Sequence, residues 1–388
     1  MGMNKKELKI FICAGEVSGD MHGAWLMEAL RAKADVPILF RGFGGDRMRE
    51  AGAEILYHTD QTAAIGITPV LMKLPFFLRM ARHLKREILA WKPDLVLTID
   101  YTGMNLNLAA FAHAHGLRTC HYVCPQVWAW KRSRIPKIGQ ILDQLLCFFP
   151  FEPELFKETP LRPTFVGHPL VDEVARTFAE PPPDLPWKGT HRVALLPGSR
   201  RSEIFHLLPR MLETAVLLES KLDGEASFII PTPTQKVRAY AEEIAQKASR
   251  RPKNLIFVDG LARHVLLQAE AAVVASGTAS LEACMMRCPT VVVYASNWLS
   301  AFIARRVITG VRFLGLANII ADREVMPELL QEAFTPERTA SLISRMITDP
   351  TYREATLQGL KETANLLGEG HAIERAAEAI LPPLQGRT

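Results

Sequence analysis

The sequence lacks any apolar run of about 18 residues, the length that a membrane-spanning helix needs, so no such helix is expected. The apolar stretch near the N-terminus is short and runs into charge, which argues against a signal peptide and for a cytoplasmic location. With 48% hydrophobic and 22% charged residues, disordered and collagen-like chains are excluded. Lys and Arg total 46 against 41 Asp and Glu, an excess too mild to predict a nucleic-acid partner.

Several cofactor motifs are also absent. None of the six cysteines forms a CxxC pair, and no His or Cys pair completes a zinc set, so buried reduced thiols are expected. The G-x-G-x-x-G spacing of dinucleotide-binding proteins and the phosphate loop G-x-x-x-x-G-K-[ST] are both missing. No Asp-x-Asp pair offers an obvious carboxylate site for Mg²⁺ or Mn²⁺. We therefore expect neither a cofactor nor a metal site.

What the sequence does contain is an alternation of short apolar runs with helical patterns. The runs are mostly continuous, as in parallel strands covered on both faces. Helical patterns between them include Ala24–Lys33, Phe76–Trp91 and Arg210–Leu222. This alternation predicts an α/β protein with doubly wound sheets. The predicted strands are Lys9–Ala14, Pro37–Phe40, Leu95–Ile99, Thr119–Val123, Leu145–Phe149, Arg192–Leu196, Ser227–Ile230, Leu255–Phe257, Ala271–Val274 and Thr290–Tyr294.

A proline-rich stretch divides the strands into two series. Three consecutive prolines within residues 177–189 are typical of a linker. We therefore predict Rossmann-like domains over residues 1–176 and 190–348. Residues 349–388 are predicted to be helices that pack back on the N-terminal domain.

Ligands of open parallel sheets bind outside the carboxyl ends of the strands, so the loops there are the candidate site. After the first strand come Glu16, Ser18, Gly19 and Asp20, which suit an anion at a helix N-terminus or an ordinary turn with a helix cap. After the third strand, Asp100 is either a general base or a helix cap.

The fourth strand of the first series is followed by two tryptophans, a glutamine and a lysine. Gln126 and Trp128 suit a sugar or an acyl-bearing ligand, and core packing of the tryptophan is the alternative.

Two loops of the second half are rich in groups that bind phosphate. Arg is suited to a bidentate grip on phosphate oxygens, and Ser-Gly-Thr at the start of a helix offers N–H groups and hydroxyls together. Glu282 follows on the same predicted helix and can accept from ribose hydroxyls. Both loops in one domain predict a bound nucleoside diphosphate, with Gly198, Ser199, Arg200, Ser276, Gly277 and Thr278 as contacts.

With these loops the chain resembles the lipid-A-disaccharide synthases, glycosyltransferases of the GT-B type with two Rossmann-like domains facing a cleft. The matching stretches cover nearly the whole chain in order: GEVSGD (15–20), HYVCPQVWAWKRSRIPKIG (121–139), FVGHPL (165–170), LLPGSRRSEI (195–204), ASGTASLE (275–282), NII (318–320) and PELLQ (327–331). Three stretches depart from the family pattern, Gly66–Leu71, Tyr101–Met104 and Leu316–Asn318.

The resemblance implies an inverting transfer from UDP-2,3-diacylglucosamine to 2,3-diacylglucosamine 1-phosphate (lipid X), giving the β-1,6-linked tetraacyl disaccharide phosphate and UDP. It implies that Asp100 is the catalytic base, that Arg200 contacts the diphosphate, and that Asn318, Glu328 and Gln331 lie on the donor side. The alternatives are another GT-B enzyme of UDP-sugars, such as a MurG-like transferase or an epimerase, and a catalytically silent paralogue that binds UDP or lipid.

Acylated substrates imply work at a bilayer, on the inner face of the inner membrane. The stretch Leu71–Lys92 carries six basic residues against one acid, with aromatics at its start. It is typical of an interfacial helix, and a core helix with a solvated basic face is the alternative. The expected membrane contacts are Phe76, Phe77, Arg79, Arg82 and Lys85. A homodimer is left open.

Overall fold

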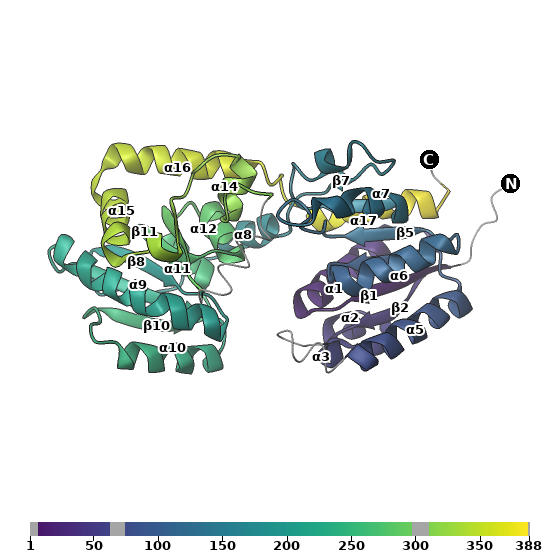
Figure 1. Cartoon of the computed structure of the whole chain (residues 1–388), viewed down its shortest axis with the longest axis horizontal. Coiled ribbons are helices and arrows are strands. Elements are labelled where there is room, and N and C mark those ends of the chain that lie inside the picture. Colours follow the sequence, from purple (N-terminus) through teal and green to yellow (C-terminus); the bar gives the residue numbers. More distant parts are fainter. Residues whose placement is uncertain (1–6, 63–73, 297–309, 387–388) are drawn as a thin grey trace. The chain divides into compact units, whose positions relative to one another are not determined.

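The computed structural model describes residues 7–62, 74–296 and 310–386. The chain divides into two compact units, shown in Figure 1. Unit 1 comprises Met1–Pro169 and Gly370–Thr388, and unit 2 comprises Leu170–Glu369. The predicted stretch Gly66–Leu71 lies outside the described residues.

The strands of unit 1 form one parallel sheet in the order β3-β2-β1-β4-β5-β6-β7. Its central strands are almost wholly buried, because helices cover both faces, as their continuous apolar runs predict. The strands are β1 (Leu8–Ala14), β2 (Ile38–Gly44), β3 (Ala53–His58), β4 (Leu95–Ile99), β5 (Thr119–Tyr122), β6 (Gln144–Cys147) and β7 (Thr164–Phe165).

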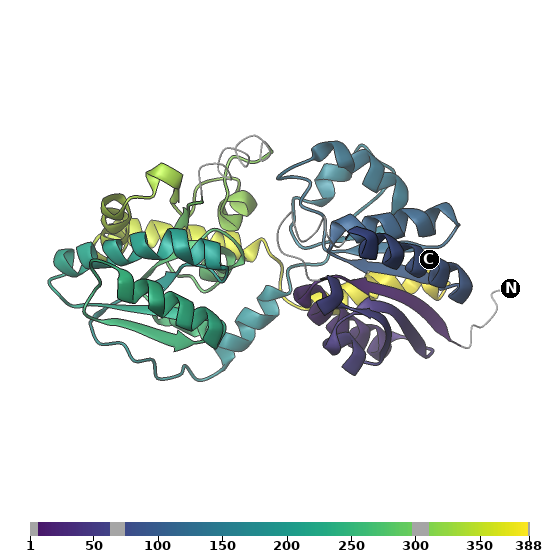
Figure 2. The ribbon, with the colours of Figure 1, turned by 60° about the horizontal axis from the view of Figure 1, so that its bottom comes forward.

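One face of this sheet packs against α1 (Val17–Lys33), α2 (Asp46–Glu50) and α17 (Ala372–Leu384). The other packs against α5 (Leu74–Trp91), α6 (Thr102–Ala114) and α7 (Ile135–Ile141). The short helices α3 (Thr59–Thr62), η1 (Arg132–Arg134) and η2 (Pro153–Phe156) lie in connections. Figure 2 shows the C-terminal helix α17 beside α1, from the opposite end of the chain.

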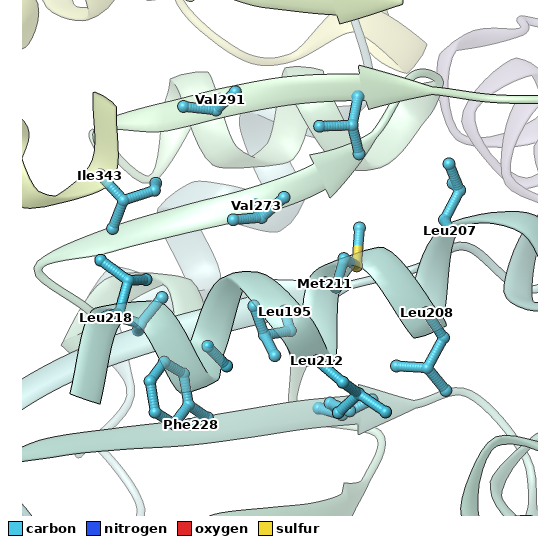
Figure 3. Close-up of a cluster of buried hydrophobic side chains, with 14 of the residues drawn as sticks. Leu195, Leu207, Leu208, Met211, Leu212, Leu218, Phe228, Val273, Val291 and Ile343 are labelled. Atoms are coloured by element: carbon cyan, nitrogen blue, oxygen red, sulfur yellow. The ribbon is translucent and has the colours of Figure 1, made fainter. Parts of the chain in front are cut away.

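Unit 2 repeats the architecture with the strand order β10-β9-β8-β11-β12-β13, again parallel. The main hydrophobic cluster lies between this sheet and α9, α10 and α15. In Figure 3, Met211, Leu212 and Leu218 of α9 lie against sheet residues such as Leu195 and Phe228. The strands are β8 (His191–Leu196), β9 (Ala226–Thr232), β10 (Leu255–Asp259), β11 (Ala271–Ala275), β12 (Thr290–Tyr294) and β13 (Glu328–Leu330).

Of the remaining helices of unit 2, α11 and α12 also pack against strands of this sheet, α8 packs against α11 and α12, and α16 packs against α12, α14 and α15. The helices are α8 (Leu170–Ala179), α9 (Arg201–Lys221), α10 (Gln235–Lys247), α11 (Ala262–Gln268), α12 (Thr278–Met285), α14 (Leu316–Ala321), η3 (Gln331–Ala333), α15 (Pro336–Thr348) and α16 (Pro350–Asn365).

The predicted domain boundaries need correction. The proline-rich residues 177–189 are not the linker, because the division falls at Pro169/Leu170 and this stretch belongs to unit 2. It is held there by Gln268, which donates to the carbonyl of Pro183 (2.8 Å) and accepts from the indole of Trp187 (3.1 Å). Of the C-terminal helices within 349–388, only α17 packs on unit 1, whereas α16 packs on α12 and α14 in unit 2.

Candidate active site

The loops after β1 and β4 come together at the switch point of the unit 1 sheet. From β1 the chain winds outward through β2 and β3, and it starts again on the other side of β1 with β4. Ligands of doubly wound sheets bind at such a point, outside the carboxyl ends of the strands. A Cβ at Gly15 would collide with the ring of Tyr101, so glycine is required for the two loops to approach this closely.

Asp100 lies in an unusual turn directly after β4. Both Asp100 (φ +44°) and Tyr101 (φ +46°) adopt the left-handed conformation, which costs non-glycine residues about 1–2 kcal/mol each. The side-chain amide of the fully buried Asn105 stabilises this turn by donating to the carbonyl oxygens of Ile99 (2.8 Å), Asp100 (2.9 Å) and Cys13 (3.2 Å). The turn that carries Asp100 therefore depends on Asn105, a residue that the sequence analysis does not single out.

Burial raises the pKa of Asp100 above the ordinary value of 3.8, and a hydrogen bond from the backbone of Tyr101 opposes this shift. The pKa of the neighbouring Tyr101 is raised as well, by burial and then by the negative charge of Glu16. A carboxylate with a raised pKa holds a proton more readily, which is the property a general base needs.

The loop after β1 divides into exposed and buried members. Glu16 and Ser18 are exposed, and Glu16 takes the N-cap position of α1 without a side-chain cap. Gly19 is buried against β1 and β4, with Ala14 and Ile99 about it. Glu16 and Ser18 are thus the members of this loop that can meet a ligand.

Asp20 does not face a ligand, contrary to the prediction, and it does not cap its own helix. It is 5% exposed, and its carboxylate accepts from the backbone N–H groups of Gly45 (2.6 Å), Arg47 (3.0 Å) and Met48 (3.1 Å). These groups lie at the start of α2, where a negative charge is favourable. Asp20 therefore fixes the loop after β2 against α1.

The two residues predicted as ligand contacts in the loop after β5 differ in exposure. Gln126 is exposed, but Trp128 is 4% exposed and packs against Phe149 and Phe151, so core packing is the correct alternative for this tryptophan. The Trp128 indole donates to the buried carboxyl of Glu152 (3.2 Å).

Glu152 is the centre of this packing. Its carboxyl also accepts from the backbone N–H groups of Phe148 and Phe149 (both 3.0 Å), and burial raises its pKa from 4.5 to about 7. Its carboxylate and the thiols of Cys124 and Cys147 lie within 4.8 Å of one another, a grouping that sequence spacing did not reveal. A hydrogen bond with Cys147, and then burial, raise the pKa of the Cys124 thiol. Burial raises the pKa of the Cys147 thiol, and its hydrogen bond with Cys124 opposes that shift. Both sulfurs therefore stay protonated. The cluster thus fits a hydrogen-bonded core better than a cation.

Unit 2 places the two predicted phosphate loops at its own switch point. The strands β8 and β11 are neighbours, and the chain winds away from them in opposite directions. Gly198 has φ +94°, and a Cβ there would collide with Glu203, so the tight turn after β8 requires glycine. Ser199 is exposed at this turn, and Arg200 is the N-cap residue of α9.

Arg200 is 79% exposed and pairs with Glu203 (3.1 Å), which also accepts from the Arg200 backbone N–H (3.3 Å). An exposed ion pair of this kind contributes little to stability, so the Arg200 guanidinium can leave Glu203 and bind a phosphate instead.

The loop after β11 is open. Gly277 and Thr278 are exposed at the start of α12, and nothing lies within 4 Å of a Cβ placed on Gly277. Ser276 donates its hydroxyl to the carbonyl of Leu314 (3.1 Å), which ties the loop to the segment before α14.

Glu282 lies further along α12 and is held by a cation. Arg263 donates to Glu282 (3.2 Å) and to Glu173 of α8 (2.7 Å). Burial raises the pKa of Glu282, and Arg263 opposes that shift.

The three residues expected on the donor side lie in α14 (Asn318), in β13 (Glu328) and directly after β13 (Gln331). Asn318 is fully buried, and its amide is used within the protein: it donates to Met326 and Glu328 (both 2.7 Å) and accepts from Val325 (2.7 Å) and Met326 (2.9 Å). A direct contact of Asn318 with a sugar is therefore not what the structure shows.

Glu328 and Gln331 likewise bond within unit 2. Glu328 accepts from the backbone N–H groups of Leu314 and Gly315 (both 2.9 Å), at the start of α14. Gln331 bonds the backbone (3.3 Å) and hydroxyl (3.2 Å) of Ser296. These residues hold the segments after β12 and before α14 in place.

Comparisons with known proteins agree with this arrangement. The model of the lipid-A-disaccharide synthetase family matches residues 10–379. A lipid-A-disaccharide synthase of Myxococcus xanthus is 38% identical over 382 residues, covering 96% of this chain and 97% of the relative. One from Geobacter sulfurreducens is 36% identical over 380 residues, covering 97% of each. The chain belongs to the lipid-A-disaccharide synthetase family.

Family membership makes the protein a glycosyltransferase of lipid A biosynthesis. Solved structures confirm the predicted GT-B fold. The glycosyltransferase of kitacinnamycin has a TM-score of 0.62 at 18% identity, covering 97% of this chain and 99% of that one. A UDP-GlcNAc 2-epimerase from Neisseria meningitidis, bound to UDP-GlcNAc, has a TM-score of 0.59 at 13% identity, covering 97% and 99%.

The expected membrane segment is a helix with one face in the core. Met80, Leu84 and Ile88 of α5 are buried, whereas Leu74 (47%) and Leu78 (48%) are exposed. Phe76 and Phe77 are half-buried, and Phe76 packs on the ring of Tyr57. The basic residues differ too, since Arg79 and Arg82 are exposed while Lys85 lies over the ring of Phe111 (5.1 Å). Within residues 7–62, 74–296 and 310–386, no helix is both long enough and apolar enough to cross a bilayer.

Proposed function

We propose that this glycosyltransferase condenses UDP-2,3-diacylglucosamine with 2,3-diacylglucosamine 1-phosphate to give the β-1,6-linked tetraacyl disaccharide 1-phosphate and UDP. One observation carries the proposal: the half-buried carboxylate at the switch point of unit 1 and the exposed loops at the switch point of unit 2 are chemically complementary. Unit 1 offers the carboxylate of Asp100, and unit 2 offers phosphate-binding loops at Ser199–Arg200 and Gly277–Thr278. A transfer between a hydroxyl and a sugar diphosphate needs a base for the first and cationic support for the second.

The reaction is a single displacement. Asp100 accepts the proton of the acceptor 6-hydroxyl while the oxygen attacks the anomeric carbon of the donor sugar. The bond from that carbon to the diphosphate breaks, its electron pair leaves with UDP, and the configuration inverts. General-base assistance of this kind contributes about 10²–10⁴-fold to the rate.

The leaving diphosphate is supported from unit 2. The guanidinium of Arg200 exchanges Glu203 for a phosphate oxygen, and the starts of α9 and α12 present backbone N–H groups. Each well-placed donor of this type contributes about 3 kcal/mol when it is aimed at charge that develops in the transition state.

The test is an assay with both acylated substrates, with products identified by mass spectrometry. We expect the disaccharide phosphate and UDP from the native protein, and both about 10²-fold or more slowly from Asp100→Asn. UDP-N-acetylglucosamine serves as the control donor, and its epimerisation or transfer to an unacylated acceptor would favour another GT-B enzyme. UDP binding without turnover of either acylated substrate would identify a silent paralogue and refute the proposal.

We also propose that α5 places the enzyme on the inner face of the inner membrane. Its exposed side combines Leu74 and Leu78 with Arg79 and Arg82, as expected of a helix at an anionic interface. Apolar insertion contributes about 25 cal/mol per Å² at any salt concentration, whereas each cation contributes about 1 kcal/mol that salt weakens.

Sedimentation with vesicles separates these two contributions. Replacing Leu74 and Leu78 by Ser should weaken binding at all salt concentrations, and replacing Arg79 and Arg82 by Gln only at low salt on anionic vesicles. The half-buried Phe76 is the control: Phe76→Ser should lower the melting temperature, since it loses core contacts. Unchanged vesicle binding by both the leucine and the arginine variants would show that α5 does not contact the membrane.

A further inference from the structure

A hollow of about 170 Å³ lies between α6 and α7 of unit 1, and no step of the reaction above uses it. Each helix contributes residues at positions i, i+3, i+4 and i+7, which is one helix face. The face of α6 runs from Gly103 to Ala110, and the face that begins at Arg134 runs along α7 to Ile141. Two parallel stripes of this kind enclose a groove about 10 Å long.

The groove changes character along its length. In a parallel sheet both helices run opposite to the strands, so α6 and α7 both begin at the carboxyl edge that carries Asp100. Gly103, three residues after Asp100, lies at this end, as do Arg134 and Lys137. Farther along, the lining is mixed: the amide of Asn107 is exposed, and Ala110 and Ile141 are half-buried apolar side chains. The cationic end of the groove is therefore on the side of the candidate base.

The two cations are available for an anion. Within the described residues, neither the Arg134 guanidinium nor the Lys137 ammonium forms an ion pair, and residues 125–142 contain four basic side chains and no acid. Nothing lies within 4 Å of a Cβ placed on Gly103, so the groove is open beside the cations. Two cations without an ion-pair partner, beside the half-buried side chains of Ala110 and Ile141, are complementary to a phosphate that carries a hydrocarbon chain.

We infer that the α6–α7 groove binds an acylated phosphate monoester, with the phosphate at Arg134 and Lys137 and the start of the chain along Ala110 and Ile141. The volume is below the roughly 300–1,000 Å³ of pockets that hold a whole ligand, so the groove takes the phosphate and part of one chain. The inference rests on the proposed function, whose acceptor, 2,3-diacylglucosamine 1-phosphate, is such a compound.

The experiment measures binding of 2,3-diacylglucosamine 1-phosphate, and of 2,3-diacylglucosamine without phosphate, to the full-length protein in a neutral detergent. Arg134→Gln with Lys137→Gln should weaken binding of the phosphorylated lipid about 10- to 100-fold and leave the phosphate-free lipid unchanged. Arg132→Gln is the matched control, since Arg132 is an exposed cation of the same stretch that does not line the groove. It should change either affinity less than about twofold, the scale of an exposed charge.

A second variant tests the apolar part of the groove and is expected to fold normally. Gly103→Leu fills the open groove, and it should preserve the melting temperature because leucine is a better helix former than glycine. It should weaken binding of both lipids, while UDP affinity stays unchanged.

Each outcome decides between the two proposals. If the native protein binds the phosphorylated lipid through Arg134 and Lys137 but does not turn it over, the groove is confirmed and the proposed function fails. If turnover occurs but the double variant binds like the native protein, the groove assignment is overturned and the function stands. An equal loss of affinity for the phosphorylated lipid in the double variant and in Arg132→Gln would show that the whole basic stretch attracts anions, and it would overturn the inference.

Discussion

Replacing Asn105 by Ala tests whether the turn that carries Asp100 depends on one buried amide. The substitution removes hydrogen bonds to three carbonyl oxygens, at 2.8, 2.9 and 3.2 Å. At about 1 kcal/mol each, their loss costs up to about 3 kcal/mol if the turn keeps its conformation. If instead the turn relaxes, Asp100 and Tyr101 leave the left-handed region and recover about 2–4 kcal/mol of backbone strain.

These two responses give different results. A rigid turn predicts a melting temperature lower by about 6–12 °C with turnover nearly intact, since about 1 kcal/mol shifts the melting temperature by about 2–4 °C in a unit of this size. A relaxed turn predicts a smaller thermal change and a large loss of kcat, because displacing a reacting group by about 1 Å can cost about 10²-fold. We expect the relaxed turn, since the strain that would be released is comparable to the bonds lost.

The assay combines a thermal melt, kcat and calorimetric UDP titration on the same preparation. UDP affinity should not change, because the phosphate loops belong to unit 2. Asn254→Ala is the matched control: it removes a single amide bond, to Ala226 (3.3 Å), and should leave kcat unaffected. Full turnover in Asn105→Ala, with or without a thermal shift, would show that Asn105 does not position Asp100.

Three further changes probe the site. Asp100→Asn should lower turnover about 10²-fold or more with UDP affinity retained, and the native pH profile should show an acidic limb above the ordinary aspartate pKa of 3.8 that is missing in this variant. Arg200→Ala should weaken UDP binding about 10-fold or more in calorimetry without lowering the melting temperature, since the side chain is 79% exposed. The pKa of Glu152 is about 7 in the folded protein against 4.5 ordinarily, so the folded state holds this proton more tightly than the unfolded state does. The free energy of unfolding should therefore fall by about 3 kcal/mol as the pH rises from 4.5 to 7. Denaturant melts at several pH values measure this fall, and Glu152→Gln should abolish it.

The central strands of both sheets were predictable from sequence, and of the four edge strands only β10 was. Leu95–Ile99 and Thr290–Tyr294 were predicted with their observed bounds because buried parallel strands are continuous apolar runs. The strands β3, β7 and β13 were missed, and each lies at the edge of its sheet. An edge strand pairs on one side only, so polar residues such as those of Glu328–Leu330 are tolerated and no apolar run marks it.

Helix starts were also harder to predict than helix interiors. The prediction placed a helix at Arg210, after Pro209, but α9 begins at Arg201 and contains that proline. Its start is marked by Glu203, which accepts from the Arg200 N–H three residues earlier. Such a start depends on one local hydrogen bond, and it is not visible in the apolar period.

Sequence motifs identify the acidic residues near a site, but not which of them are free to act. Asp20, Glu152 and Glu328 each accept three N–H groups from loops or side chains around them, so their lone pairs are committed to holding those loops. Among the described residues, Asp100 is stabilised chiefly by one backbone N–H, that of Tyr101, and burial dominates its pKa. A carboxylate with few donors gains most from accepting a proton. This difference in hydrogen bonding, together with its place at the switch point, is why we assign the base to Asp100 and not to the other buried acids.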